Sequence, residues 1–325
     1  MDRVAVFGIG STNFRYAAAT PTDGLLTEPR VEPTRPNDLA AQLLDAVATL
    51  SGAVDRRLDG VAVSVAGLAD AERGVVRAFD TPAGETVDRI ELGPRLSEEY
   101  GLGLTLVNDC NAAAFGEWHY GARTDERCVA HLTFGTGIGG GVVENGRLNR
   151  GESGQAGEFG LVSLDATSEL ESCGVTGAWE ALCSGRGIPR FVAHRLHETD
   201  ADSVLADVDD LTAEAVFDAA DDDEFAAACL DRIDRYNAAG VAAVCNAVEP
   251  GLVTLGGGVA LNNEARVRDG IARHLDDYCF VDPPEIRTTD LGDDIGLYGA
   301  LATHRARVER ERWVSGAEPV EEATD

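Results

Sequence analysis

The chain has 325 residues, a length that predicts two domains of ordinary size, and 44% of its residues are hydrophobic, enough for two cores. Its formal net charge of −30 argues against nucleic acid or anionic lipid as partners, because an acidic surface repels other polyanions. The chain has no lysine, which excludes a Walker P-loop, the strand lysine of protein kinases and lysine Schiff-base chemistry.

The charge and the cysteines predict where the protein works. Acidic residues are spread along the whole chain, as expected of a halophilic protein in a cytoplasm where about 1 M salt shortens the Debye length to about 3 Å. The alternative is an ordinary acidic cytosolic enzyme. The seven cysteines form no C-x-x-C pair, and we find no signal peptide and no apolar run of about 18 residues. We therefore expect a reducing, cytoplasmic location without membrane contact.

The first third of the chain predicts strands and helices that alternate. Strands are expected at 3–9, 14–19, 60–66 and 104–107, and a helix at 39–50 with Asn37 as its N-cap. Gly10, Ser11 and Thr12 form a tight turn between the first two strands. The fourth strand leads into Asn108 and Asp109, and an alanine-rich helix follows from 112.

A glycine-rich stretch follows the next predicted strand, 129–134. Residues 135–141 contain five glycines, although each glycine inside an element costs roughly 0.5–1 kcal/mol relative to alanine. Such a loop is typical of a backbone that approaches phosphate, and Thr136 adds a hydroxyl. A dinucleotide fingerprint would require a helix directly afterwards, whereas Asn145-Gly146 predicts a hairpin. A glycine-rich turn without a ligand is the other alternative.

The second half of the chain adds one more glycine turn. A strand at 252–255 leads into Gly256, Gly257 and Gly258, after a small-residue helix at 238–247. The very acidic segment 198–224 is expected to be a solvated helix and loop. The charged end, from about 309, is expected to fray.

Three carboxylates are candidates for chemistry. Asp109 stands at a strand end between two asparagines, which suits a general base beside the glycine turns, or else an N-cap of the following helix. Glu158 and Glu180 flank a glycine-containing loop and could accept hydrogen bonds from sugar hydroxyls. Each of them could instead be a plain surface residue.

These motifs together resemble the ROK family of sugar kinases, open reading frames and repressors. The matching segments, in order and spacing over roughly residues 3–305, are 108–117, 135–141, 157–160, 173–180, 255–258 and 291–301. The resemblance implies an α/β protein with the two-domain actin-like ATPase (ribonuclease H-like) fold and a sugar in an interdomain cleft. The first domain would comprise 1–112 and a C-terminal helix at about 297–310, the second 113–296, with 311–325 a disordered tail.

The resemblance also implies roles for individual residues. Asp109 would be the catalytic base that accepts the sugar hydroxyl proton. The substrate-binding residues would be Asn108, Glu158, Glu180 and Gly67. The ATP- and phosphate-binding residues would be Gly10, Ser11, Thr12, Gly135, Thr136, Gly137, Gly257 and Gly258. ATP and Mg²⁺ would be the cofactors, with the magnesium ligands unassigned.

The chain departs from the family pattern at its metal positions. Gly8 stands where the family carries an aspartate that organises magnesium, so that either another carboxylate such as Asp293 or Asp294 takes over or activity is weak or gone. Asn13 replaces the lysine after the first-turn threonine. The four zinc-ligand positions read Leu161, Glu171, Cys173 and Ala178. No zinc is expected, because structural zinc requires four ligands, mostly nitrogen and sulfur.

These observations predict an ATP-dependent sugar kinase of the glucokinase type that phosphorylates a hexose, with glucose first among the candidates. The alternatives are a kinase for fructose or an N-acetylated amino sugar, and a non-catalytic sugar- or nucleotide-binding regulator. A DNA-binding repressor is not expected, because the first strand begins at residue 3. We expect a homo-oligomer, either a dimer or a tetramer.

Overall fold

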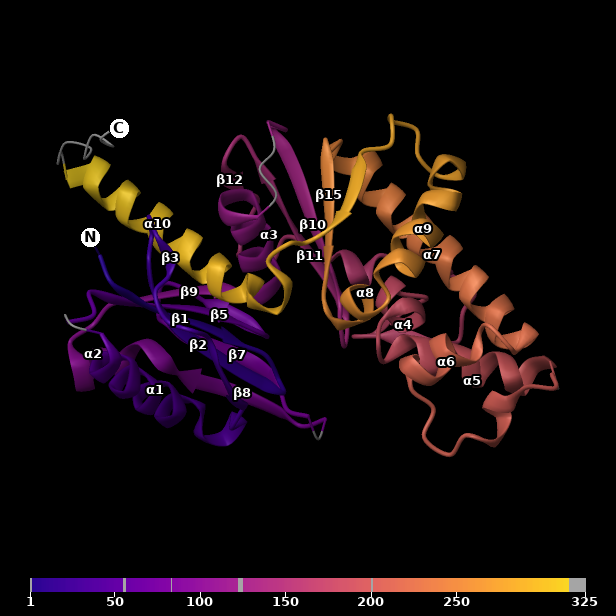
Figure 1. Cartoon of the computed structure of the whole chain (residues 1–325), viewed down its shortest axis with the longest axis horizontal. Helices are drawn as coiled ribbons and strands as arrows, with labels where there is room; N and C mark the ends of the chain where they lie inside the picture. The colour runs from indigo at the N-terminus through magenta and orange to yellow at the C-terminus, as the bar shows by residue number, and fades with distance from the viewer. Residues whose placement is uncertain (1, 55–56, 83, 122–124, 200, 316–325) are drawn as a thin grey trace. The chain divides into compact units, whose positions relative to one another are not determined.

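The computed structural model divides into two compact units, Met1–Arg123 with Asp293–Asp325, and Thr124–Gly292. It describes residues 2–54, 57–82, 84–121, 125–199 and 201–315. Both units are mixed α/β, as the sequence predicts, and Figure 1 labels their elements. Among the described helices, none is both long and apolar enough to cross a membrane.

Unit 1 is built on a sheet of order β3-β2-β1-β5-β9, with β4 paired to β2. The strands are β1 (Val4–Ile9), β2 (Asn13–Thr20), β3 (Gly24–Leu25), β4 (Arg30–Pro33), β5 (Gly60–Val65) and β9 (Leu104–Asn108). β1 runs antiparallel to β2 and parallel to β5, which in turn is parallel to β9. A separate three-stranded sheet consists of β6 (Leu68–Asp70), β7 (Val75–Asp80) and β8 (Thr86–Glu91).

Helices cover both faces of the unit 1 sheet. Alternate strand residues point to opposite faces, so apolar residues of one strand contribute to two cores. Phe7 and Ile9 of β1 belong to a core shared with α1 (Leu39–Ala53) and α2 (Leu92–Tyr100). Val4 and Val6 belong to a second core, shared with α10 (Ile295–Ser315). α3 (Asp109–Tyr120) packs along α10, as Figure 1 shows. The end of the chain therefore completes the core of its beginning.

Unit 2 repeats this sheet pattern in the order β12-β11-β10-β15-β16. Its strands are β10 (Cys128–Phe134), β11 (Ile138–Glu144), β12 (Arg147–Leu148), β15 (Leu252–Gly256), β16 (Glu285–Thr288) and a small hairpin, β13 (Glu171–Ser172) and β14 (Val175–Thr176). Its helices are α4 (Trp179–Cys183), α5 (Gly187–Thr199), α6 (Ala213–Ala219), α7 (Glu224–Val248), α8 (Gly258–Asn262) and α9 (Glu264–His274). One apolar core joins the sheet to these helices.

Short 3₁₀ helices connect several of these elements. They are η1 (Pro36–Asp38), η2 (Phe159–Leu161), η3 (Val204–Asp207), η4 (Leu275–Asp277) and η5 (Gly292–Asp294).

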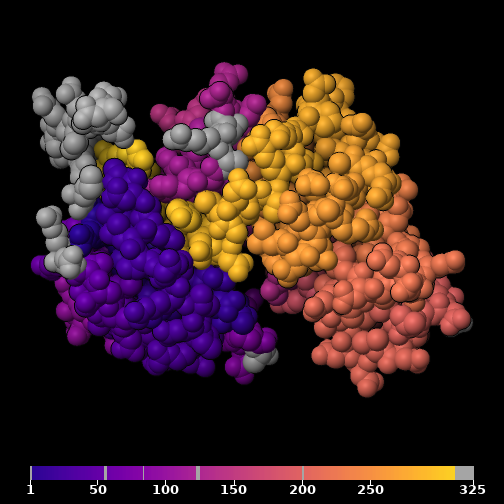
Figure 2. All heavy atoms as spheres, viewed as in Figure 1, coloured from indigo at the N-terminus to yellow at the C-terminus, as the bar shows by residue number. Residues whose placement is uncertain are grey.

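In the space-filling view of Figure 2, the N-terminal strands and α1 form one continuous indigo surface of unit 1.

Three predicted details are corrected by these boundaries. Asn37 does not cap α1, because it lies inside η1, and Asp38 takes the N-cap position. α3 starts at Asp109 rather than 112, so a domain boundary at 112 would cut the helix, which belongs to unit 1. α10 continues regularly to Ser315, past the point where fraying was predicted. The rest of the predicted tail, 316–325, lies outside the described residues.

Candidate active site

Asp109 is held where β9 passes directly into α3. The preceding residue, Asn108, is the N-cap, and its side-chain oxygen accepts hydrogen bonds of 3.1 Å from the backbone N–H groups of Cys110 and Asn111. The Asn108 amide donates to Asp109 Oδ1 at 3.0 Å, and the Cys110 N–H donates to the same oxygen at 2.9 Å. The capping role considered for Asp109 thus falls mainly to Asn108, and Asp109 is the first helical residue.

The environment of Asp109 suits a proton acceptor. Protein atoms crowd around its carboxyl group although part of the side chain reaches solvent, and this burial raises the pKa of Asp109 above its ordinary value. The hydrogen bonds from Cys110 and Asn108 oppose the rise. A raised pKa makes a carboxylate a stronger base, and the capping bonds fix the direction in which it points.

Two backbone turns lie at the same end of the unit 1 sheet. The turn Gly10–Thr12 joins β1 to β2; its ends are tied by a 2.9 Å bond from the Gly10 N–H to the Asn13 carbonyl. Gly67 follows β5 with φ +89°, and a Cβ there would lie 2.9 Å from the carbonyl oxygens of both Arg77 and Ala78. The Gly67 carbonyl accepts from the Asn108 amide at 3.4 Å. Unit 1 thus gathers Gly67 and Asn108 beside Asp109.

The predicted glycine loop is the turn of the β10–β11 hairpin in unit 2. Phe134 pairs with Ile138 across Gly135, Thr136 and Gly137, which confirms a strand-to-strand loop and excludes the dinucleotide fingerprint. The Gly185 N–H donates to the Gly135 carbonyl at 2.8 Å. Thr136 is exposed, so its hydroxyl is available to a ligand. The hairpin turn at Asn145-Gly146 is also present, with φ +51° and +73°.

Some glycines of this stretch serve packing rather than ligand approach. A Cβ on Gly140 would lie 2.5 Å from the His131 carbonyl and 2.8 Å from the Phe159 ring. A Cβ on Gly157 would collide with the Gly140 carbonyl, and the Gly140 N–H donates to the Gly157 carbonyl at 3.1 Å. The number of glycines therefore reflects both a loop and a close strand–loop contact, of which the sequence predicted only the loop.

The remaining predicted residues of unit 2 differ in their surroundings. Glu158 is exposed and precedes η2. Glu180 is partly buried at the start of α4 and accepts hydrogen bonds from Ile138 and Ser172. Gly257 has φ +82°, and a Cβ there would lie 2.5 Å from the Phe134 carbonyl. Gly258, the first residue of α8, has open space around its Cβ position.

Gly8, the residue that stands where the family carries an aspartate, lies in β1 of unit 1. Gly8 pairs with Arg15 across β1 and β2. Arg15 forms ion pairs with Asp293 at 2.7 Å and Asp294 at 3.6 Å, so a guanidinium neutralises the carboxylates proposed as replacements. Within the described residues, no three acidic, histidine or cysteine side chains form a cluster able to hold a metal. Mg²⁺ in kinases is bound largely by substrate phosphates, so Mg²⁺ needs no all-protein cage, and we assign it no protein ligand.

The four positions of the family zinc motif do not fit zinc. Leu161 and Ala178 offer no donor atom, and Ala178 is fully buried. Cys173 is exposed with φ +50°, at the tip of the β13–β14 hairpin that Glu171 begins. Hydrogen bonds hold this segment instead: Asp165 accepts from the Tyr236 hydroxyl of α7 at 2.8 Å.

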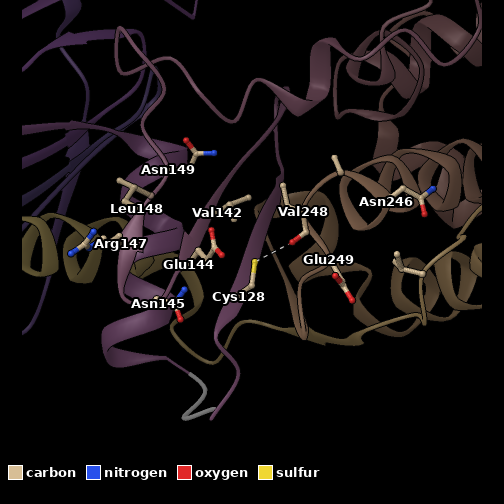
Figure 3. A pocket seen from close by; sticks show the side chains of 12 residues that line it. Cys128, Val142, Glu144, Asn145, Arg147, Leu148, Asn149, Asn246, Val248 and Glu249 are labelled. Atoms are coloured by element: carbon tan, nitrogen blue, oxygen red, sulfur yellow. Dashed lines mark hydrogen bonds between the residues drawn. The ribbon is translucent and has the colours of Figure 1, made fainter.

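A cavity of about 920 Å³ opens elsewhere in unit 2 (Figure 3). Its lining comes from β10–β12, the end of α7 and Val281, and it includes none of the predicted site residues. Figure 3 shows the Cys128 thiol pointing to the Val248 carbonyl, 3.5 Å away. Burial, with Glu144 and Glu249 nearby, raises the pKa of Cys128, which keeps this thiol protonated and unreactive near neutral pH.

Two residues that support the predicted site were not found from the sequence. Ser172 donates to Glu180 at 2.5 Å, but it lies between two zinc-motif positions and carries no signal of its own. Trp179 is fully buried; its ring stacks edge-on against Phe134 at 5.5 Å, and its indole N–H donates to Asn237 at 2.8 Å. The Trp–Glu pair could have indicated an anchor beside a functional residue.

Comparison with known proteins decides the family. The model of the ROK family matches residues 4–307, nearly the whole chain. The chain belongs to the ROK family. This confirms the predicted resemblance and, with the solved structures below, the predicted fold class of the actin-like ATPase sugar kinases.

Relatives and solved structures agree over most of the chain. Glucokinase from Halalkalibacterium halodurans is 31% identical over 306 residues, covering 90% of this chain and 91% of the relative. A ROK hexokinase structure from Thermus thermophilus is 30% identical with a TM-score of 0.79, covering 95% and 99% of the two chains. A Streptomyces griseus ROK glucokinase, in complex with glucose and AMPPNP, is 28% identical with a TM-score of 0.74, covering 94% and 99%. Escherichia coli N-acetyl-D-glucosamine kinase is 31% identical, covering 92% and 98%.

Proposed function

We propose that this ROK-family chain transfers the γ-phosphoryl group of ATP to a hexose, with glucose as the preferred substrate. The enzyme class is an ATP-dependent sugar kinase, in agreement with the glucokinase and hexokinase relatives. Glucose is favoured because the more similar relatives are named glucokinases. The amino-sugar kinases among the relatives support an N-acetylated hexosamine as the second candidate.

The observation that carries this proposal is the placement of Asp109. A carboxylate of raised pKa stands at a strand end, fixed by the capping Asn108, and the resemblance to the family implies that this residue is the base. In the proposed mechanism Asp109 accepts the proton of the attacking sugar hydroxyl. Asn108, Gly67, Glu158 and Glu180 would hold the other hydroxyls, and the turns at 10–12 and 135–137, with Gly257 and Gly258, would bind the nucleotide. When bound, Mg²⁺ would neutralise phosphate charge.

A coupled assay of ADP release tests the proposal. The purified chain is incubated with ATP, Mg²⁺ and one sugar at a time: glucose, fructose, N-acetylglucosamine or N-acetylmannosamine, at low and at molar KCl. We expect the largest kcat/KM with glucose. A larger value with an N-acetylated sugar would reassign the substrate. Tight sugar binding by calorimetry without ADP release from any sugar would favour the non-catalytic regulator, with Gly8 as the reason.

A further inference from the structure

The carboxylate of Glu180 bridges two segments of unit 2 that are distant in sequence. Its Oε2 accepts a 3.0 Å hydrogen bond from the backbone N–H of Ile138, the first residue after the hairpin turn at 135–137. Its Oε1 accepts a short, 2.5 Å bond from the Ser172 hydroxyl in β13. One carboxylate, itself a proposed sugar ligand, therefore joins the turn proposed to bind phosphate to the β13–β14 hairpin.

Two glycines leave the space that this bridge needs. A Cβ on Gly137 would lie 2.6 Å from Glu180 Oε2, and a Cβ on Gly160 would lie 3.1 Å from the same oxygen. Gly160 belongs to η2, the 3₁₀ helix that begins directly after Glu158, and Glu158 is the other proposed sugar ligand of unit 2. The glycine loop, η2 and α4 thus all meet at a single oxygen atom.

The rest of α4 is fixed, so the bridge cannot simply follow a moving helix. Trp179, the neighbour of Glu180, is buried against Gly240 of α7 and Phe134 of β10. The Ser184 hydroxyl donates to the Glu180 carbonyl at 2.7 Å. The carboxylate therefore ties the loop at Ile138 to a fixed helix, alongside the bond from the Gly185 N–H to the Gly135 carbonyl.

We propose that Glu180 is a positioning residue that couples sugar binding to the conformation of the nucleotide-binding loop. An ionised carboxylate has about four acceptor sites, and the two bonds above use two of them, which leaves capacity for a sugar hydroxyl. Hydrogen bonds to a charged carboxylate are stronger than those between neutral groups. A sugar hydroxyl bound at Glu180 would therefore share this carboxylate with the Ile138 N–H. This inference rests on the proposed sugar kinase function and adds to it: Glu180 acts on nucleotide affinity even when no sugar is present.

Calorimetric titration of the full chain with AMPPNP and Mg²⁺, without sugar, tests the coupling. For Glu180→Gln, which keeps one acceptor oxygen but removes the charge, we expect the Kd for AMPPNP to rise about fivefold to thirtyfold, because the bond to Ile138 is weakened. Ser172→Ala, which keeps the carboxylate, should shift the Kd in the same direction by less. The matched control is Glu158→Gln, an identical substitution at an exposed carboxylate, which should weaken glucose binding and leave sugar-free AMPPNP binding unchanged.

Two binding constants, for AMPPNP and for glucose, decide whether Glu180 acts on the nucleotide loop as well as on the sugar, and repeating the AMPPNP titration with saturating glucose measures the coupling between them. Wild-type AMPPNP affinity in Glu180→Gln, together with weaker glucose binding, would overturn the proposal and leave Glu180 a plain sugar ligand. If the melting temperature of Glu180→Gln falls, Ser172→Ala decides by the same comparison. If the wild type binds no AMPPNP, the proposed function fails instead, and hydrogen exchange at the Ile138 amide still tests the bridge. Exchange as slow in Glu180→Gln as in the wild type would show that the Glu180 carboxylate does not hold the Ile138 amide, and would overturn the proposal.

Discussion

The two units contain the same sheet pattern but make different use of it. In each unit an antiparallel hairpin is followed by two parallel strands: β2-β1-β5-β9 in unit 1 and β11-β10-β15-β16 in unit 2. In each, a glycine with positive φ follows the first parallel strand, Gly67 in one and Gly257 in the other. The last strand differs: β9 ends in a capped helix that carries Asp109, whereas β16 continues through Asp290 toward η5.

This comparison shows how one architecture can be specialised at its loops. The features of unit 1 that surround Asp109 come from adjacent residues, because Asn108, Cys110 and Asn111 make the cap. The loop of unit 2 is instead held by residues 42 and 50 positions away, Glu180 and Gly185. We therefore expect the geometry around Asp109, the proposed base, to tolerate distant substitutions better than the loop does.

The largest effect is expected from removing the proposed base of unit 1, Asp109. Asp109→Asn keeps the side-chain shape and the cap made by Asn108 but cannot accept a proton. Turnover should fall by ~10²–10⁴-fold, the usual contribution of a positioned base, while the melting temperature and glucose binding stay near wild type. In the wild type, kcat/KM should decline on acidification at a pH above that of an ordinary aspartate, because the pKa of Asp109 is raised.

Steady-state kinetics and thermal melting of both proteins check this prediction. A second variant, Asp109→Ala, controls for any share that Asp109 has in stabilising the helix start, on the order of 1 kcal/mol. Asp109 is not the base if Asp109→Asn retains most of the wild-type turnover.

The next prediction uses a feature that the units share. Each buries a histidine against a threonine: His131 Nδ1 lies 2.9 Å from the Thr254 hydroxyl, and His304 Nδ1 lies 3.0 Å from the Thr105 hydroxyl. Burial lowers the pKa of His131 to about 3 and that of His304 to about 4. In the unfolded chain both would titrate near 6.5.

Because the folded state resists protonation of both histidines, the stabilisation is complete above pH about 6.5 and is lost as the pH falls toward 4 and 3. Each unit should lose about 3 kcal/mol between pH 6.5 and 4, on the scale of about 1.4 kcal/mol per pKa unit, and unit 2, which has the larger shift, should lose about 1.4 kcal/mol more below pH 4. Urea unfolding between pH 3 and 8, followed in wild type, His131→Gln and His304→Gln, measures this. A wild-type stability that stays constant between pH 7 and 4.5 would contradict it.

The smallest expected effect compares the equivalent glycines. A Cβ on Gly257 would meet three backbone atoms of Phe134 at 2.5–2.9 Å, whereas a Cβ on Gly67 has its two nearest contacts at 2.9 Å. Both positions have positive φ, so alanine strains each by roughly 1–3 kcal/mol. We expect Gly257→Ala to destabilise more than Gly67→Ala in chemical unfolding. Gly258→Ala is the matched control, with nothing within 4 Å of the added carbon; an equal loss there would refute the steric explanation.

The sequence predicted those features of the fold and site that are local. The order of strands, the strand-to-strand glycine loop and the Asn145-Gly146 turn depend on near neighbours, and all are present. Two predictions failed at helix starts: Asn37 lies in a 3₁₀ turn, and α3 begins at Asp109 because Asn108 provides the cap. The competing cap of Asn108 accounts for the second failure, whereas at Asn37 the 3₁₀ turn that Pro36 begins takes the place of a capped helix start.

The contacts that sequence reasoning missed are long-range. Nothing near Ser172 indicates that its hydroxyl meets Glu180, and nothing near Gly8 indicates that Arg15 would hold Asp293, 278 residues later. Similarly, Gly140 and Gly157 require each other through tertiary packing, and each alone resembles an ordinary loop glycine. Such pairs become visible only when the sheets and loops are assembled.

The position of α10 has a consequence for how the chain is made. The core of Val4, Val6, Ala17, Ala19 and Ala62 is closed by Leu297, Ala300 and Leu301, which are synthesised after all of unit 2. Unit 2 is a continuous segment and can bury its own core as soon as residue 292 has emerged. We therefore expect the middle of the chain to fold before its beginning, with one apolar face of the first strands uncovered until α10 has emerged from the ribosome.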